Sequence, residues 1–248
     1  MQNVKLVIAY DGRNYMGWQK TVTGASIEAE LQSQLEKILR HPIDLQAASR
    51  TDRGVHARGQ VVNFLTTKHP LDLSKLKISV NQFLPREIVV ISAEMAEPSF
   101  HPTIDCTGKE YCYFLCYDTV QLPEHRYYSW HTPGPLDIEK MKLATQLLTG
   151  KHDFSSFCNV KKNASYSDYE RIVNLLQIDE LEGKRLCITV QGNHFLYKMV
   201  RNIVGTLVYI GRGKIELNAL PSLIQSEDRT QIGMTAPAHG LFLKEVFF

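Results

Sequence analysis

The sequence predicts an α+β fold in which strands, hairpins and helices are mixed along one chain. Three observations predict it. Short β-prone runs alternate with helical stripes through all 248 residues. The runs 171–181 and 185–191 flank a Glu-Gly-Lys turn and predict a β-hairpin. No Gly-x-Gly-x-x-Gly follows a predicted strand and no P-loop motif is present, so nothing supports a doubly wound nucleotide-binding sheet.

The first elements are a strand and a helix. Residues 4–10 are apolar and β-prone and end at Asp11-Gly12, which predicts a strand that enters a loop. Residues 26–39 place apolar side chains at helical spacing, and Ser26 is the expected N-cap. Further strands are predicted over 60–67, 88–95, 109–118 and 241–248.

The second part of the chain begins a new cycle of elements. Asp137 is the expected N-cap of a helix over 137–148. Residues 195–209 predict a strongly apolar helix that is closed by a glycine, and residues 217–225 predict a shorter one. Because each part contains strands and helices in a similar order, we expect two halves, residues 1–122 and 123–248. The join is expected near the three prolines of residues 122–135.

Composition excludes several classes of protein. The chain has 44% hydrophobic residues and a net charge of +2, which is typical of a soluble globular protein and not of a collagen, a coiled coil or a disordered chain. The charge is unevenly distributed. Residues 195–214 contain four basic and no acidic side chains, and residues 50–68 contain four basic and one acidic. These two segments are the expected surfaces for a polyanion, and the remainder is net acidic.

The termini, apolar stretches and cysteines indicate a cytoplasmic protein without a membrane span. No signal peptide is visible, and the charge-free apolar stretch 203–210 is far shorter than the roughly 20 residues that a span needs. Five cysteines without a Cys-x-x-Cys motif predict reduced thiols. Cys112 and Cys116 lie four residues apart on a predicted strand, about 13 Å, which is too far for two ligands of one zinc ion. We therefore expect no metal site there.

Residues 49–58, Ser-Arg-Thr-Asp-Arg-Gly-Val-His-Ala-Arg, are the most unusual stretch. One carboxylate, that of Asp52, lies among three guanidinium groups. Nearby arginines keep a carboxylate ionised, which makes it a poor general acid but a competent nucleophile or electrostatic partner. Gly54 permits a tight turn at this point. On charge alone, an ordinary Asp–Arg ion pair in a surface turn remains open.

Residues 50–57 resemble the active-site motif of the A-type tRNA pseudouridine synthases, Gly-Arg-Thr-Asp-x-Gly-Val-His-Ala. Other blocks resemble this family in the same order: Tyr10-Asp11-Gly12, Tyr15 and Gly17-Trp18-Gln19; Ser99-Phe100-His101-Pro102, Lys109, Tyr111 and Tyr113; Gly150, His152-Asp153-Phe154 and Phe157; residues 195–205; and Gly240-Leu241, Leu243 and Val246. The resemblance thus covers nearly the whole chain. Ser49, Thr103 and Phe248 depart from the pattern, outside the Arg-Thr-Asp core, and the Thr103 departure is expected to weaken one phosphate contact.

The resemblance implies the pseudouridine synthase fold, with two similar halves and a central mixed or antiparallel sheet flanked by helices around one cleft. It implies isomerisation of uridine to pseudouridine at positions 38, 39 and 40, in the anticodon arm of tRNA. In this reaction the N1–C1′ bond breaks and C5 bonds to C1′, without a cofactor or a metal. The base must first leave its stack, at a cost of a few kcal/mol. A homodimer that binds tRNA is also implied.

By motif match, Asp52 is the expected nucleophile, and Arg50 and Arg201 are the expected catalytic arginines that approach it. Three routes stay open: attack at C1′ of the ribose, addition to C6 of the base, or a glycal route that begins with loss of the C2′ proton. Tyr111 and Leu243 are expected to contact the flipped uridine. The expected RNA-binding residues are Arg53, Arg58 and Lys198.

Two other functions are compatible with these residues. The first is a non-catalytic tRNA-binding or chaperone protein of the same fold, for which a carboxylate among phosphate-binding arginines is unnecessary. The second is a metal-dependent nuclease or phosphatase that uses Asp52, His56, His101, His152 and Asp153, which no compact ligand motif supports.

Overall fold

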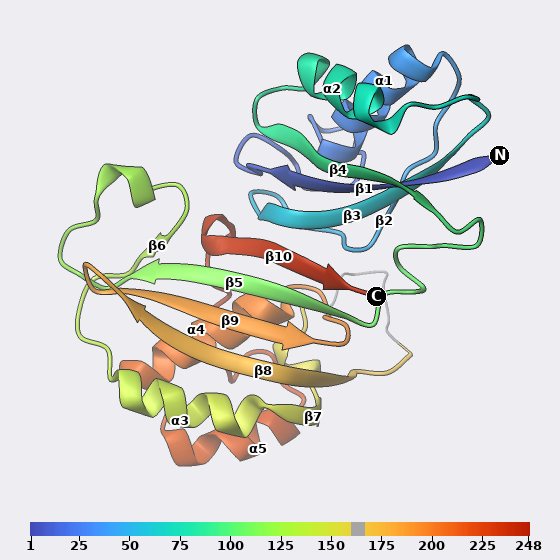
Figure 1. Ribbon diagram of the computed structural model, residues 1–248. Coiled ribbons are helices and arrows are strands. Elements are labelled where there is room, and N and C mark those ends of the chain that lie inside the picture. The colour runs from blue at the N-terminus through green and yellow to red at the C-terminus, as the bar shows by residue number, and fades with distance from the viewer. Residues whose placement is uncertain (160–166) are drawn as a thin grey trace. The chain divides into compact units, whose positions relative to one another are not determined.

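The computed structural model describes residues 1–159 and 167–248, which form two compact units (Figure 1). The first unit contains Met1–Thr107 and Phe242–Phe248, and the second contains Gly108–Leu241. The boundary that the sequence suggested, at residue 122, lies inside the second unit. The reason is that strand β5 (Gly108–Cys116) pairs with strand β9 (Arg185–Gly192) of that unit.

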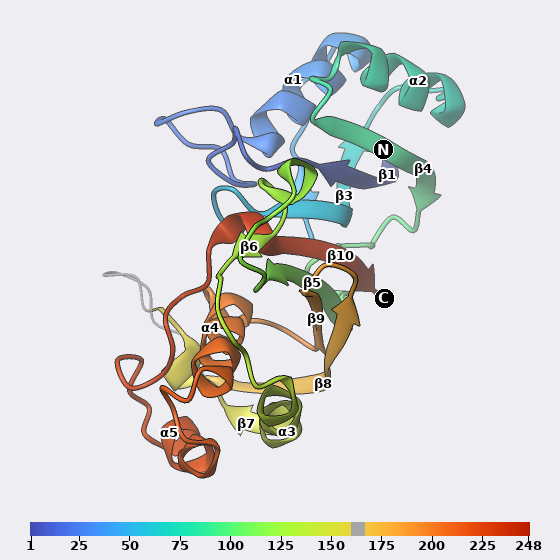
Figure 2. The same cartoon turned by 90° about the vertical axis from the view of Figure 1, so that its left-hand side faces the viewer.

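The first unit is a sheet with two helices. Its elements are β1 (Gln2–Tyr10), α1 (Ile27–Leu39), β2 (Gln46–Ala47), β3 (His56–Thr66), α2 (Leu73–Phe83), β4 (Ile88–Ala96) and β10 (Leu241–Phe247). The strand order is β4-β1-β3-β10, with β1 antiparallel to both neighbours and β10 parallel to β3. The short β2 also pairs with β3. Figures 1 and 2 show α1 and α2 on the same face of this sheet.

Local sequence explains both helices of the first unit. The Ser26 side chain accepts a hydrogen bond from the backbone N–H of Ala29, 3.3 Å away, which confirms the predicted N-cap. Asp72 caps α2 in the same way, through the N–H of Lys75 at 3.0 Å. The sequence pattern does not indicate α2, because this helix buries only two apolar side chains, Leu76 and Val80.

The second unit is a mainly antiparallel sheet with helices, in which only the short β6 (Trp130–His131) pairs parallel to its neighbour among the described strands. Its elements are β5, β6 (Trp130–His131), α3 (Ile138–Leu148), β7 (Gly150–Asp153), β8 (Glu170–Leu181), β9, α4 (Met199–Gly211) and α5 (Leu220–Gln225). Short 3₁₀ turns lie over Pro123–His125, Ser155–Phe157, Leu217–Ala219 and Ala238–Gly240. The strand order is β5-β9-β8-β7, and β6 pairs with β5. The predicted hairpin is confirmed as β8 and β9.

Helix α4 begins later than the sequence predicted. Lys198 adopts a φ of +62°, in the left-handed region, so the helix starts at Met199 and not at residue 195. It then continues to Gly211, and most of its side chains are buried. Residues 217–225 form a 3₁₀ turn followed by α5, whose first turn contains Pro221. The mixed strands, hairpins and helices confirm the predicted α+β class.

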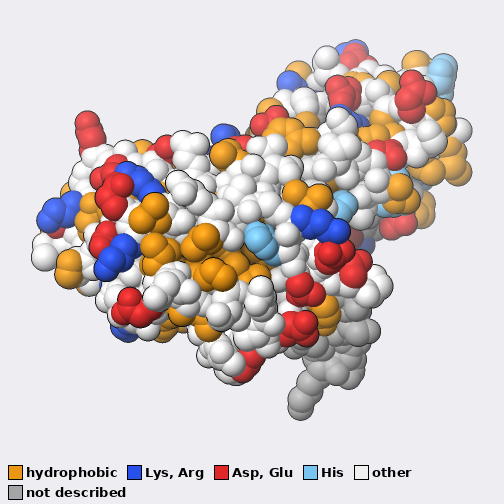
Figure 3. Space-filling model, turned by 90° about the horizontal axis from the view of Figure 1, so that it is seen from below, with side chains coloured by type: hydrophobic (Ala, Val, Ile, Leu, Met, Phe, Trp, Pro, Cys, Tyr) orange, Lys and Arg blue, Asp and Glu red, His pale blue; other side chains and the backbone are white. Residues whose placement is uncertain are grey.

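The surface of the second unit is mixed in character. Figure 3 shows hydrophobic side chains among acidic and basic ones on one face of the molecule. Leu143 on α3 and Ile172 on β8 are among the exposed large apolar residues. An ion pair of 3.0 Å between Lys142 and Glu180 joins the same two elements. In the described part of the chain, no helix combines the length and apolar character needed to cross a membrane.

Candidate functional site

Asp52 lies in the loop between β2 and β3 of the first unit. The backbone N–H of Val55 donates to the Asp52 carbonyl, 3.1 Å away, and closes a tight turn. Gly54 adopts a φ of +79° within it, so the predicted turn is confirmed. The Asp52 side chain is half-buried, while the neighbouring Arg50 and Arg53 are exposed.

Buried groups hold the backbone that precedes Asp52. The hydroxyl groups of Tyr10 and Thr51 form a hydrogen bond of 2.8 Å, and the Thr51 carbonyl accepts the N–H of Trp18 at 3.1 Å. The buried Gln60 side chain accepts from the Ser49 N–H at 3.2 Å and donates to the Ser49 carbonyl at 2.6 Å. Because both contacts use the Ser49 backbone, they do not depend on its departure from the family pattern.

Two glycines let the N-terminal block, residues 10–19, approach the Asp52 loop closely. A Cβ atom at Gly12 would lie 2.0 Å from the Val55 carbonyl oxygen. Gly17 has a φ of +103°, and its Cβ would lie 2.5 Å from the Thr51 carbonyl oxygen. Side chains are excluded from both positions, because such distances are far inside van der Waals contact. The Tyr10–Trp18 region therefore supports the Asp52 loop directly.

His56 connects the same loop to β10. Its Nδ1 atom accepts the Gly12 N–H at 3.1 Å, and its ring stacks on Phe242 with 4.5 Å between centroids. The guanidinium of Arg58 lies 4.8 Å from the centre of the Phe242 ring. The parallel pairing of β10 with β3 places Leu243 beside Ala57. Leu243, an expected substrate contact, is thus held next to the end of the motif and is fully buried.

The remaining candidates belong to the second unit. Tyr111 on β5 lies opposite Val190 of β9 and packs edge-on against Phe195, with 5.2 Å between ring centroids. Only 7% of Tyr111 is exposed. Lys198 and Arg201 lie at the beginning of α4, and both are partly exposed. The predicted site residues are thus divided between the units: the first contains Arg50, Asp52, Arg53, Arg58 and Leu243, and the second contains Tyr111, Lys198 and Arg201.

Arg201 is held by the chain that precedes β10. Its Nε donates to the Ala236 carbonyl at 2.7 Å, and the Ala236 N–H donates to the Arg201 carbonyl at 3.1 Å. Burial raises the pKa of Tyr113 well above 10, and the charge of Arg201 opposes this rise. Burial also lowers the pKa of His239 below 6.5, and the same charge adds to this lowering. The Tyr113 and His239 side chains, on which the charge of Arg201 acts, are therefore both neutral at pH 7.

The basic residues of 195–214 do not form one surface. Arg212 Nη2 donates to the carbonyls of Thr132 and Pro133 at 2.9 and 3.0 Å, so this guanidinium forms hydrogen bonds within the second unit. Arg212 and Lys214 follow the far end of α4, about 20 Å from Lys198 for a helix of 13 residues. Lys68 follows the end of β3, which is about 26 Å from Arg58 along the strand.

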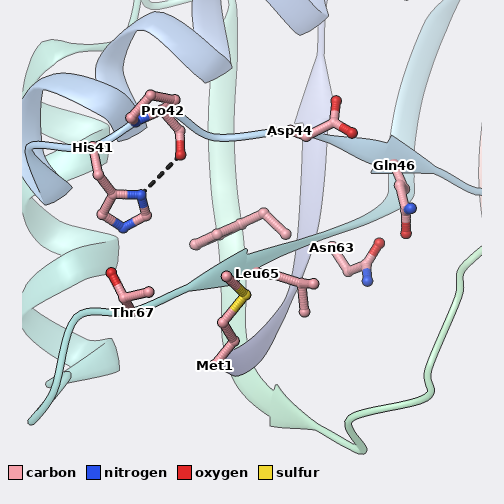
Figure 4. A pocket seen from close by; sticks show the side chains of 9 residues that line it. Met1, His41, Pro42, Asp44, Gln46, Asn63, Leu65 and Thr67 are labelled. Carbon is pink, nitrogen blue, oxygen red and sulfur yellow. Dashed lines mark hydrogen bonds between the residues drawn. The ribbon is translucent and has the colours of Figure 1, made fainter.

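A separate pocket of about 260 Å³ opens on the first unit. Figure 4 shows its lining residues, which are Met1, His41, Pro42, Asp44, Gln46, Asn63, Phe64, Leu65 and Thr67. His41 Nδ1 lies 2.8 Å from the Pro42 carbonyl oxygen. None of the candidate residues lines this pocket, which adjoins the end of β3 remote from His56.

Sequence reasoning missed the residues that hold the candidates in place. Tyr10, Thr51 and Gln60 support the Asp52 loop, and Asn202 and Arg229 support the segment that contacts Arg201. One signal was available for Asn202, which is a polar residue on the buried side of a largely apolar helix. Polar residues at such positions are hydrogen-bonded in native structures.

Comparison with known proteins identifies the family. The family model described as tRNA pseudouridine synthase matches residues 6–103 and 144–248. The chain is 60% identical, over its full length and 95% of the relative, to tRNA pseudouridine synthase A 2 of Protochlamydia amoebophila (strain UWE25). It is 42% identical, over the full length of both chains, to tRNA pseudouridine synthase A of Thermoanaerobacter sp. (strain X514).

Among solved structures, a chain in the crystal structure of a Cbf5-Nop10-Gar1 complex matches 96% of this chain over 57% of its own length, with 12% identity and a TM-score of 0.38. The family model covers most of the sequence, and the two relatives extend over all of it. The chain therefore belongs to the tRNA pseudouridine synthase family and is an isomerase that converts uridine to pseudouridine in tRNA.

Proposed function

We propose that Asp52 is the nucleophile in the isomerisation of uridines 38, 39 and 40 in the anticodon arm of tRNA. One observation carries this proposal: residues 49–51 before Asp52 are held by buried groups, while the carboxylate itself is half-buried. Trp18 and Gln60 bond to their backbone, and Tyr10 bonds to the Thr51 hydroxyl. A reactive group that is fixed before substrate binds loses less entropy in the transition state. This arrangement suits a nucleophile that must meet one atom of the substrate.

The chemistry needs an ionised carboxylate by each of the three routes. Attack at C1′, addition to C6 and removal of the C2′ proton all begin with a carboxylate oxygen that donates an electron pair. The N1–C1′ bond then breaks, C5 bonds to C1′, and the proton lost from C5 is balanced by one gained at N1. We propose that the guanidinium groups of Arg201 and Arg50 attract the Asp52 carboxylate and orient it for this step.

The other candidate residues bind the substrate in this proposal. Tyr111 and Leu243 contact the uridine in this proposal, on the strength of the motif match, and an aromatic ring and an apolar side chain are suited to packing against an unstacked base. Three further residues, namely Arg53, Arg58 and Lys198, contact phosphates. Arg53 and Arg58 are exposed, and each phosphate contact should add about one unit to the salt dependence of tRNA binding.

We also propose that the enzyme acts in the cytoplasm as a homodimer. The reduced state of all five cysteines supports the cytoplasm, and similarity to the family along the whole chain supports the dimer. Size-exclusion chromatography with light scattering should give twice the chain mass of 28.3 kDa at micromolar concentration. A mass of one chain, with activity retained, would contradict the dimer.

The test of the catalytic assignment uses an unmodified tRNA transcript in EDTA. Pseudouridine is mapped by primer-extension stops that depend on carbodiimide treatment. Wild type should produce stops at positions 38 to 40, and Asp52→Asn should produce none while binding tRNA within about twofold of wild type. Asp44→Asn, an exposed carboxylate on the same unit, is the matched control and should retain the stops. Turnover by Asp52→Asn would exclude Asp52 as the nucleophile, and stops confined to other positions would exclude the assignment to uridines 38, 39 and 40.

A further inference from the structure

Residues 228–240 form a segment, here called the strap, that lies along the first turns of α4 in the second unit. Two close approaches fix its path. A Cβ atom at Gly205 of α4 would lie 1.7 Å from the Met234 carbonyl oxygen, and one at Gly233 would lie 2.5 Å from the Gly205 backbone. The N–H of Gly233 donates to the Thr206 hydroxyl at 3.2 Å. The strap and α4 are therefore in backbone-to-backbone contact.

Arg229 bonds the strap to itself and to α4. Its Nη1 donates to the Gly233 carbonyl at 2.9 Å, and its Nη2 donates to the Thr235 hydroxyl and the Asn202 side-chain carbonyl, both at 2.9 Å. All three acceptors are neutral, and within residues 1–159 and 167–248 Arg229 forms no ion pair with a carboxylate. A planar guanidinium with donors in two directions can reach three acceptors at once, whereas a lysine ammonium on a flexible stem does not reproduce that geometry.

Asn202 is fully buried and uses its whole hydrogen-bonding capacity. Its Nδ2 donates to the Phe157 carbonyl at 2.6 Å and to the Asn159 side chain at 2.8 Å. Its Oδ1 accepts from Arg229 and, at 2.7 Å, from the Thr235 hydroxyl. The bond from Arg229 therefore reaches the helix residue that directly follows Arg201.

The strap determines where the Arg201 side chain points. Arg201 Nε donates to the Ala236 carbonyl at 2.7 Å, and the Ala236 N–H returns a bond of 3.1 Å to the Arg201 carbonyl. A guanidinium whose Nε is bonded has a fixed plane, so its terminal nitrogens have a fixed direction. Any shift of the strap relative to α4 moves the Ala236 carbonyl and turns the guanidinium with it.

We propose that Arg229 is a positioning residue, which acts through the strap to orient the Arg201 guanidinium for the isomerisation. This inference rests on the proposed catalytic role of Arg201. Arg229 contacts no reacting atom in it, and its contribution is the fork of hydrogen bonds to Gly233, Thr235 and Asn202. Removing the fork should lower the rate of the chemical step without lowering the affinity for tRNA.

The experiment is a double-mutant cycle between Arg229→Lys and Arg201→Lys, with single-turnover rates and tRNA dissociation constants measured for all four proteins. Arg229→Lys alone should lower the rate about tenfold and leave the dissociation constant within twofold. In the Arg201→Lys background, the same change should lower the rate less than twofold, because it acts through the group already altered. A merely structural Arg229 would reduce the rate by the same factor in both backgrounds.

Two further variants keep the outcome decisive. Leu148→Val, in the core of α3 in the same unit, is the matched control for reduced stability and should keep the wild-type rate below its unfolding temperature. If Arg229→Lys does not fold, Thr235→Val removes one arm of the fork, and its twofold to threefold loss should also vanish in the Arg201→Lys background.

The two proposals fail in different ways. A wild-type rate for Arg201→Lys would refute the role of Arg201 and, with it, the inference about Arg229. A slow Arg201→Lys enzyme with independent losses from the Arg229 change would refute the inference alone. Loss of tRNA affinity without loss of rate would assign Arg229 to binding instead.

Discussion

Replacing Gly12 with alanine should damage catalysis through the backbone of the Asp52 loop. The added Cβ would lie 2.0 Å from the Val55 carbonyl oxygen, whereas Cβ atoms essentially never come closer than 3.0 Å to a neighbour. The loop that ends at Val55 must therefore retreat by about 1 Å. A displacement of this size at a reacting group costs about 100-fold in rate, or about 2.7 kcal/mol of transition-state stabilisation. Overpacking should also lower the free energy of unfolding by about 1–3 kcal/mol.

The assay compares single-turnover rates of pseudouridine formation at a temperature where both proteins are folded. The affinity for tRNA should change less than about threefold, because phosphate contacts are distributed over the surface. Gly24→Ala is the control, since its Cβ would meet only the flexible Met16 side chain, at 2.9 Å. A Gly12→Ala enzyme with a rate within threefold of wild type would refute the claim that this contact positions Asp52.

Three further outcomes are expected. The Ile43 backbone amide, which donates to the carboxylate of Glu36, lowers the pKa of Glu36 below 4.5. The hydrogen bond to the ionised Glu36 carboxylate therefore stabilises the fold fully at neutral pH, and this stabilisation is lost in acid. Glu36→Gln should lower the free energy of unfolding, measured with urea, by about 1 kcal/mol at pH 7 and by progressively less below pH 4.5. Gly205→Ala should lower the melting temperature by several degrees, because its Cβ would lie 1.7 Å from the Met234 carbonyl oxygen. Arg212→Met should reduce stability and leave the salt dependence of tRNA binding unchanged, because this guanidinium bonds to carbonyls within its unit; a shallower salt dependence would show that it contacts phosphate.

Local chemistry made a helix cap, the turn of the motif and one hairpin predictable. Ser26 was recognised as an N-cap because its side chain needs only the amide three residues later. The turn after Asp52 was predictable because Gly54 tolerates a positive φ. The hairpin of β8 and β9 followed from a short turn between two β-prone runs. Each of these features is decided by residues close together in the sequence.

Other features of the site depended on residues far apart in the sequence. Arg229 and Asn202 are 27 residues apart, and Tyr10 and Thr51 are 41 apart, so neither hydrogen bond leaves a local pattern. The boundary between the units likewise followed from the pairing of β5 with β9, a partner about 75 residues away.

By itself, the sequence determined the α+β class, the helix caps and turns, and the family to which the Arg-Thr-Asp motif belongs. Only the tertiary structure decided that a C-terminal strand returns to lie beside β3, that the N-terminal block supports the Asp52 loop, and that Arg212 faces carbonyls of its own unit. The physical reason is that caps and turns satisfy backbone groups a few residues away, whereas these contacts require chain ends and loops to meet. These long-range contacts form because they bury apolar surface and pair polar groups across the whole fold.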